Sequence, residues 1–138
     1  MPKASFSVRN VPANRTVYVR MSGKFDIATM RALCDQYRAV TDTYAGGPHY
    51  VLADMRGMLP ALPEVGLMLG SAIGHGRAHG VRLCAHLSDD TVQRLQVARL
   101  ARQSTPRDDV TVDVISLEEG ERLIREHRDR DRMQLEQR

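Results

Sequence analysis

Two short and almost continuously apolar segments limit the folds that this chain of 138 residues can adopt. They run from His49 to Met55 and from Val81 to Leu87, and a helix-forming pattern follows each of them. Near-continuous apolar strands are typical of parallel sheets that are covered on both faces. Strands that alternate with helices imply right-handed crossover connections. The sequence therefore predicts an α/β fold with parallel central strands.

The other elements follow from periodicity and capping signals. An N-terminal β-hairpin is expected, because apolar and polar residues alternate on either side of a turn at residues 10–15. Asp26 is a good N-cap for a first helix, and the S-x-x-E box that begins at Ser116 starts a last helix. Residues 61–79 and the residues after Asp90 have the spacing of two more helices. The order predicts a mixed, mostly parallel sheet of about five strands with about four helices.

The composition fits one globular domain. Apolar residues make up 42% of the sequence and charged residues 27%, and no apolar run is long enough to cross a bilayer. The first residues lack the apolar region of a signal peptide, so a cytoplasmic location is expected. The formal charge of +3 is spread along the chain, which argues against nucleic-acid binding. Cys34 and Cys84 are expected to be buried, reduced thiols.

The C-terminal segment differs from the rest of the sequence. Residues 127–132 are nearly all charged, so the last helix either projects into water there with paired charges or frays. We expect a single domain over residues 1–126, followed by a charged helix end or tail over residues 127–138.

The motifs of the common catalytic classes are missing. The sequence has no glycine-rich phosphate loop, no dinucleotide fingerprint and no G-x-S-x-G elbow. His75 and His79 stand four residues apart on an expected helix, but no third metal ligand is evident, so we expect a solvated or capping pair. Asp54 ends the central strand without an evident nucleophile or acid partner, so a turn-forming role is expected. We therefore expect no enzyme activity, no metal and no cofactor.

Glycines and apolar residues near the central strand are candidates for binding. Gly66, Gly70 and Gly74 form one stripe on the second helix, which serves either tight packing or a groove for a partner. The third helix carries a broad apolar stripe opposite a basic face, formed by Val92, Leu95, Val97, Ala98, Leu100 and Ala101. Methionine-rich clusters fill irregular cores or line adaptable pockets. The candidates for an apolar ligand pocket are Met55, Met58, Leu62 and Met68.

Three stretches carry a resemblance to a known family. They read VYVRMSGKFD at residues 17–26, VLADMRG at 51–57 and VISLEEGERL at 114–123. In this order they resemble the STAS superfamily, the fold of bacterial anti-sigma-factor antagonists, and especially its SpoIIAA-like branch. The resemblance extends from Thr16 to Glu126. It implies a compact sheet with helices that is used for binding rather than for turnover.

One feature of that family is absent here. Its antagonists carry a phosphorylatable Ser, next to an Asp, where the helix after the central strand begins. The matching residues, 62–65, read LPEV and include no Ser or Thr, and Ser71 lies too far into the helix. The resemblance therefore implies no phosphorylation switch at this place, where Glu64 could supply a fixed negative charge. SpoIIAA-like members also resemble lipid-binding CRAL-TRIO domains, which leaves a small apolar ligand or lipid as an alternative.

These observations predict a non-enzymatic regulatory module of a bacterial cytoplasm. It would bind a protein partner, or a second copy of itself as a dimer, through the loop after the central strand and the glycine-striped helix. The expected contact residues are Asp54, Arg56, Gly57, Met58, Leu59, Glu64, Gly66, Gly70 and Gly74. A carrier of a small apolar ligand is the alternative. A hydrolase or metal-dependent enzyme built on His75, His79 and Asp54 is the least favoured.

Overall fold

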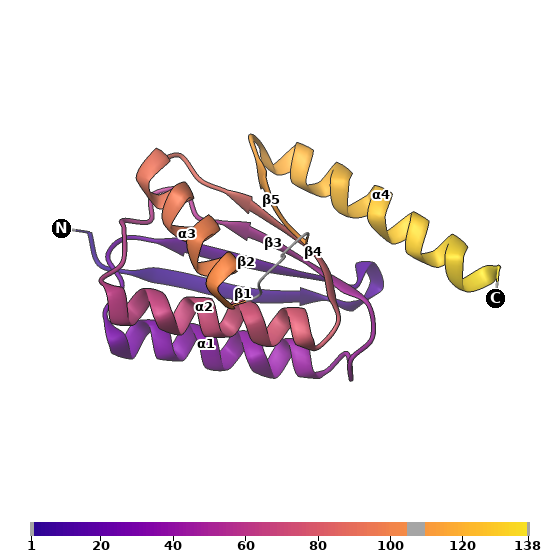
Figure 1. The fold of residues 1–138 in the computed structure, drawn as a ribbon, viewed down its shortest axis with the longest axis horizontal. Coiled ribbons are helices and arrows are strands. Elements are labelled where there is room, and N and C mark those ends of the chain that lie inside the picture. The colour runs from indigo at the N-terminus through magenta and orange to yellow at the C-terminus, as the bar shows by residue number, and fades with distance from the viewer. Residues whose placement is uncertain (1, 105–109, 138) are drawn as a thin grey trace.

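The computed structural model describes residues 2–104 and 110–137, and Figure 1 shows their arrangement. The elements follow in the order β1 (Ser5–Val11), a short 3-10 helix η1 (Pro12–Asn14), β2 (Thr16–Ser22), α1 (Ile27–Asp42), β3 (His49–Asp54), α2 (Pro63–Ala78), β4 (Val81–Leu87), α3 (Thr91–Ser104), β5 (Thr111–Val114) and α4 (Leu117–Glu136). The predicted α/β class, with an N-terminal hairpin, five strands and four α-helices, is confirmed.

The strands lie in the sheet in the same order as in the sequence, β1-β2-β3-β4-β5. β1 and β2 pair antiparallel, and every later pair is parallel. In each parallel connection a helix returns the chain to the start of the next strand. The carboxyl ends of β2 to β5 therefore meet the N-termini of α1 to α4 at one edge of the sheet, which we call the carboxyl edge (left in Figure 1).

The sheet separates two apolar layers. On one face, Val17, Val19 and Val51 pack against residues of α1, α2 and α3 such as Met30 and Val65. On the other face, alternate residues of β3 and β4 pack against Ile124 and Leu123 of α4. All six residues of β3 are buried, as its near-continuous apolar character predicts. Figure 1 shows α1 and α2 side by side on their face and α4 on the other.

The predicted helix starts are correct at two positions. The Asp26 carboxylate accepts a hydrogen bond from the Thr29 N–H at 2.8 Å, and the Ser116 hydroxyl accepts one from the Glu119 N–H at 3.0 Å. These contacts satisfy N–H groups that the first turn of a helix leaves without backbone partners. Both cysteines are buried, and neither is part of a disulfide. None of the helices in the described part of the chain combines the length and the apolar character that a membrane span requires.

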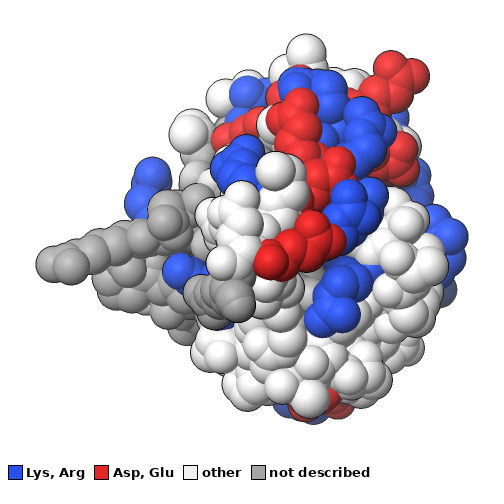
Figure 2. Space-filling view, turned by 90° about the vertical axis from the view of Figure 1, so that its right-hand side faces the viewer, with Lys and Arg blue, Asp and Glu red and all other residues white. Residues whose placement is uncertain are grey.

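Helix α4 continues through the charged segment as far as Glu136. Figure 2 shows that Lys, Arg, Asp and Glu side chains of both signs gather over the upper part of this end of the molecule. Two of the ion pairs on α4 are Arg122–Glu126, at 3.0 Å, and Arg132–Asp129, at 3.4 Å. A surface of mixed sign does not form the clustered basic face that is typical of nucleic-acid binding.

Candidate functional site

Asp54 lies at the carboxyl edge between two arginines. The parallel register places Arg20 of β2 beside Asp54 of β3, and the Arg20 guanidinium donates to Oδ2 at 2.6 Å. The Arg56 guanidinium donates to both carboxylate oxygens at 2.9 Å, and its backbone N–H donates to Oδ1 at 3.2 Å. Hydrogen bonds from Arg56 hold the pKa of Asp54 below its usual value, against the opposing effect of burial. The carboxylate is ionised, and it organises the turn that follows the strand, as the sequence predicts.

The loop after β3, residues 55–62, is held on its α1 side by backbone contacts. The Gly23 N–H donates to the Gly57 carbonyl at 2.9 Å, and the Leu59 N–H donates to the Gly23 carbonyl at 3.1 Å. The Lys24 ammonium donates to the Pro60 carbonyl at 2.6 Å. The loop after β2 is thus joined to the loop after β3 at three points.

The same loop is also held on its α3 side. The Gly57 N–H donates to an Asp89 carboxylate oxygen at 3.1 Å. The Gln96 side-chain amide makes two hydrogen bonds with the backbone of Ala61, accepting from its N–H at 3.1 Å and donating to its carbonyl at 2.8 Å. A loop that is fixed on both sides loses little conformational entropy when a partner binds it.

The predicted contact residues divide between the surface and the interior. Those at the surface are Arg56, Gly57 and Glu64, with Leu59 and Gly74 partly buried; those that are buried are Asp54, Met58, Gly66 and Gly70. A Cβ on Gly66 would lie 3.5–3.8 Å from atoms of Leu100 and Gln96, so this glycine faces α3 of its own chain. The first part of the glycine stripe therefore serves internal packing.

Exposed apolar side chains concentrate at the carboxyl edge. Among the described residues, nine large apolar side chains are exposed, and seven of them lie within the first two turns of a helix or next to its start. These seven are Ile27, Leu62, Leu67, Val92, Leu95, Ile115 and Leu117. The other two, Met133 and Leu135, lie at the far end of α4. Solvent-facing apolar groups gathered in one region are typical of interaction surfaces.

The sequence did not predict that most of these seven apolar side chains are exposed. Val92 and Leu95 belong to the broad apolar stripe of α3, but they are 63% and 64% exposed, whereas Val97 and Leu100 are buried. The stripe is wider than the single face that a helix can bury against a sheet. This excess width was the available signal that part of the stripe faces solvent.

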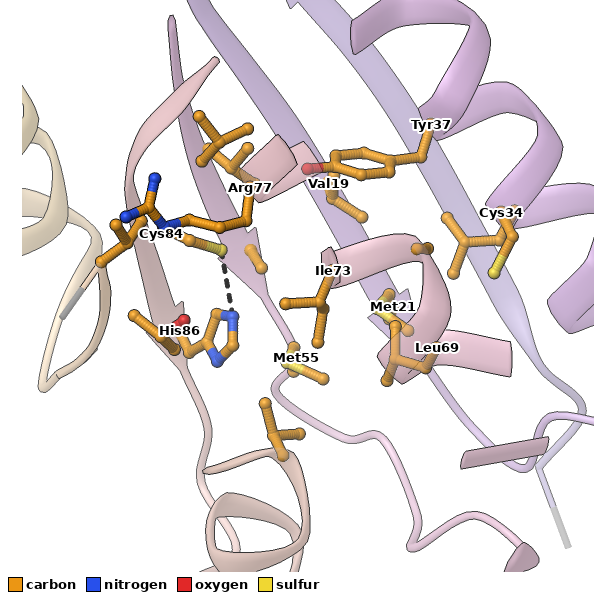
Figure 3. A pocket seen from close by; sticks show the side chains of 18 residues that line it. Val19, Met21, Cys34, Tyr37, Met55, Leu69, Ile73, Arg77, Cys84 and His86 are labelled. Carbon is orange, nitrogen blue, oxygen red and sulfur yellow. Dashed lines mark hydrogen bonds between the residues drawn. The ribbon is translucent and has the colours of Figure 1, made fainter. Parts of the chain in front are cut away.

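An apolar cavity of about 60 Å³ lies between the sheet and the helices (Figure 3). Of the four residues predicted for an apolar pocket, only Met55 lines it. Met58 is buried elsewhere, where its sulfur accepts a hydrogen bond from the Gln93 amide at 3.1 Å, and Leu62 is exposed. Pockets for drug-sized ligands measure roughly 300–1,000 Å³. In this conformation the cavity holds only a very small molecule.

Two of the polar side chains in the cavity wall contact each other. The Cys84 sulfur lies 3.1 Å from Nε2 of His86, two residues further along β4. Both side chains are buried on the same face of that strand. Buried polar atoms are normally hydrogen-bonded, and this contact gives the thiol and the imidazole such a partner inside an apolar layer.

One of three comparisons with known proteins bears on the fold. No protein-family model matches the sequence, and no curated protein matches it. Among solved structures, the crystal structure of an anti-sigma factor antagonist from Mycobacterium paratuberculosis matches with a TM-score of 0.60 and 16% sequence identity. The match covers 89% of this chain and 95% of that chain. The STAS fold that the sequence resemblance implied is thus confirmed, and function has to be argued from the site.

Proposed function

We propose that this chain is a non-catalytic regulatory module that binds a protein partner through the carboxyl edge of its sheet. The observation that carries the proposal is that seven exposed apolar side chains lie at or next to helix starts along the carboxyl edge, which also holds a loop that is fixed on both sides. Interfaces bind most strongly where apolar groups meet a rigid surface. The central contacts would be Leu62 and Leu67 of the α2 region and Val92 and Leu95 of α3.

The charges at this edge favour a partner that presents apolar and acidic groups. Four of its carboxylates already have partners within the chain: Asp26, Asp89 and Asp90 accept backbone N–H groups, and Asp54 binds two arginines. The guanidinium side chains of Arg20 and Arg56 remain 54% and 46% exposed. Each guanidinium can therefore bind a carboxylate of a partner while it keeps its hydrogen bond to Asp54. The similar solved structure is named an anti-sigma factor antagonist, and we infer an anti-sigma factor as the partner class.

The proposed binding does not depend on phosphorylation at the start of α2. Residues 62–65 contain no Ser or Thr, and Glu64 is an exposed residue of the first helical turn. A negative charge is favourable at a helix N-terminus because the backbone N–H groups there carry partial positive charge. Glu64 would thus give the edge a constant charge where a switchable one is expected in the STAS family.

Site-specific cross-linking in the native host tests the location of the surface. A photoreactive residue at Leu67, on the proposed surface, is compared with one at Leu135, which is similarly exposed at the far end of α4. We expect a partner to be captured from position 67 and not from position 135. Equal capture at both positions would contradict the proposal, and a cross-linked mass of two copies would identify the partner as the chain itself.

A carrier of a small apolar ligand is the second candidate. The observation that favours it is the apolar cavity lined by Met55, Leu69 and Ile73. Because the cavity holds only about 60 Å³, a fatty acid would require α2 to move away from the sheet. Native mass spectrometry after incubation with fatty acids tests this candidate, and a spectrum without any bound mass would exclude it.

A further inference from the structure

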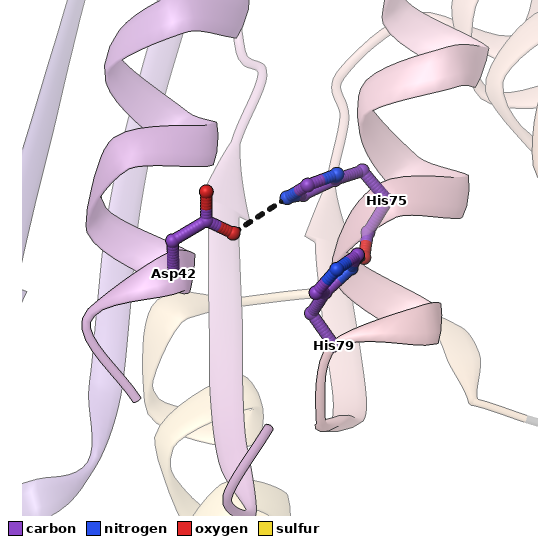
Figure 4. Close-up of side chains that lie close together, drawn as sticks. All are labelled: Asp42, His75 and His79. Atoms are coloured by element: carbon purple, nitrogen blue, oxygen red, sulfur yellow. Dashed lines mark hydrogen bonds and ion pairs between the residues drawn. The ribbon is translucent and has the colours of Figure 1, made fainter. Parts of the chain in front are cut away.

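A cluster of three metal-binding side chains lies at the end of the molecule opposite the carboxyl edge. Asp42 is the last residue of α1, His75 lies in the last turn of α2, and His79 caps that helix. Figure 4 shows both imidazole rings extending from α2 toward the Asp42 carboxylate. We propose that these three residues form a binding site for a divalent transition-metal cation of the zinc type.

The three donor atoms are already close together. Nε2 of His75 lies 2.7 Å from Oδ1 of Asp42, and one donor atom from each of the three residues lies within 4.8 Å of the others. Zinc bonds of about 2.0–2.2 Å place tetrahedral ligand atoms about 3.3 Å apart. The widest separation therefore has to close by roughly 1.5 Å at most, and the 2.7 Å between His75 and Asp42 has to open by roughly 0.6 Å. Asp42 and His79 are both exposed, so their side chains can rotate by these amounts without disturbing the core.

The hydrogen bonding of His79 prepares it to bind a metal. Its Nδ1 lies 2.7 Å from the backbone carbonyl of His75, and a carbonyl can only accept, so Nδ1 carries the proton. The lone pair is then on Nε2. Metal-bound histidines generally donate their other ring N–H to a carbonyl or carboxylate in this way. The rings of His75 and His79 stack at 4.0 Å with an angle of 19° between their planes, so the two imidazoles lie face to face at the end of α2.

The electrostatics of the site favour a cation. The C-termini of α1 and α2 both end here, and each carries partial negative charge from its unpaired carbonyl groups. The Asp42 carboxylate is unfavourable at such a position unless a positive charge compensates it. The nearest cationic neighbour on α1, Arg38, lies one turn earlier and donates to the Ser71 hydroxyl of α2 at 3.1 Å. Arg38 thus binds α2, while Asp42 hydrogen-bonds to Nε2 of His75 at 2.7 Å, a contact that a metal ion would replace.

The donor set selects the class of metal. Two imidazole nitrogens and one carboxylate oxygen suit Zn²⁺ and its transition-metal neighbours, whereas Mg²⁺ and Ca²⁺ prefer oxygen ligands alone. Three protein ligands leave a fourth position for water. A bound ion would connect the ends of α1 and α2. The sequence concealed this site because Asp42 precedes His75 by 33 residues and meets it only when the helices pack.

Zinc titration of the untagged, full-length protein tests the proposal. We expect one equivalent of Zn²⁺ to bind in competition with a chromophoric chelator and to raise the melting temperature. His79→Ala and Asp42→Asn should each weaken binding at least tenfold and abolish the melting shift. His127→Ala, which changes a histidine of α4 away from the cluster, should bind like the wild type.

Two outcomes would overturn the proposal. One is a wild-type protein that binds no stoichiometric zinc, and the other is a pair of cluster variants that bind as tightly as the wild type. A cobalt-loaded sample distinguishes this site from binding at Cys34 or Cys84, because nitrogen and oxygen ligands give no sulfur-to-cobalt charge-transfer band. The cluster lies away from the carboxyl edge, so either result leaves the proposed partner surface to its own test.

Discussion

The Tyr50 hydroxyl donates a hydrogen bond of 2.5 Å to the Asp131 carboxylate, which joins the central strand to the second half of α4. Burial and the neighbouring carboxylate both raise the pKa of Tyr50, so the phenol remains a neutral donor. Arg128 adds a second connection by donating to the Asn14 carbonyl at 3.2 Å. The charged segment beyond residue 126 is thus held against the sheet.

Removal of the Tyr50 hydroxyl should loosen this half of α4. We expect Tyr50→Phe to lower the free energy of unfolding by about 1 kcal/mol, because a net hydrogen bond is lost from a partly buried site. Hydrogen exchange should quicken at the amides of residues 127–136 and remain unchanged in α1. Met133→Ala, at an exposed position of the same helix, is the matched control. Unchanged exchange in the tyrosine variant would show that packing alone holds the segment.

Buried His49 should make stability depend on pH. Its Nδ1 donates to the Gly47 carbonyl at 2.9 Å, its Nε2 accepts from Thr41, and burial lowers its pKa. The unfolded chain takes up a proton on His49 near pH 6.5, whereas the folded chain does so only at lower pH. The contribution of neutral His49 to the free energy of unfolding is therefore fully present above about pH 6.5 and is lost as the pH falls toward the folded-state pKa. Uptake of one proton changes the free energy of unfolding by at most about 1.4 kcal/mol per pH unit.

Urea unfolding at several pH values between 5 and 7.5 measures this slope. The wild type should lose more stability toward acid than His49→Gln, which cannot take up the proton. Equal slopes for the two proteins would mean that His49 does not control the acid response.

The helix pair α1–α2 depends on a close approach at Gly76. A Cβ at this position would lie 2.2 Å from the Tyr37 hydroxyl oxygen, and Tyr37 is buried. Gly76→Ala should therefore cost about 1–3 kcal/mol of stability through overpacking. Tyr37→Phe should recover part of this loss in the double variant, since it removes the clashing oxygen.

Gly66→Ala is the matched comparison for Gly76→Ala. A Cβ at Gly66 meets α3 only at ordinary contact distances of 3.5–3.8 Å. The better helix propensity of alanine should then raise stability by up to about 1 kcal/mol. Thermal unfolding distinguishes the two variants, and a greater loss at Gly66 than at Gly76 would contradict the packing described here.

Asp54 should matter more to stability than Arg20. Asp54→Asn leaves Arg20 and Arg56 without their shared carboxylate, and we expect a loss of about 1–2 kcal/mol. Arg20→Gln should cost less than about 1 kcal/mol, because an exposed ion pair contributes little. Because the pKa of Asp54 is lowered, its contribution is present near neutral pH and disappears as the pH falls below about 4. Denaturant titrations of both variants measure the difference, and equal losses would count against the central role of Asp54.

Local signals in the sequence were sufficient to predict the fold. The near-continuous apolar run of β3 indicated burial on both faces, and Asp26 and Ser116 marked two helix starts correctly. Element boundaries were less accurate: the second helix was expected at 61–79, whereas α2 spans Pro63–Ala78. Leu62 instead stays extended as the N-cap of α2, and the proline that follows it favours such a conformation.

Long-range contacts account for what the sequence could not predict. The pairing of Arg20 with Asp54 depends on the register between β2 and β3. The meeting of Asp42 with His75 depends on how α1 packs against α2. Exposure of Leu95 depends on which part of its stripe the sheet covers. The first two relationships join residues that are distant in sequence, where periodicity carries no information.

The affinity of the partner for two matched variants tests the central claim most directly. Leu67 and Leu135 are 64% and 60% exposed, so replacing either with Asp should leave the fold intact. With the purified partner identified by cross-linking, isothermal titration calorimetry should show at least tenfold weaker binding for Leu67→Asp and wild-type binding for Leu135→Asp. Wild-type affinity in the folded Leu67→Asp variant, or an equal loss in both, would contradict a partner surface at the carboxyl edge.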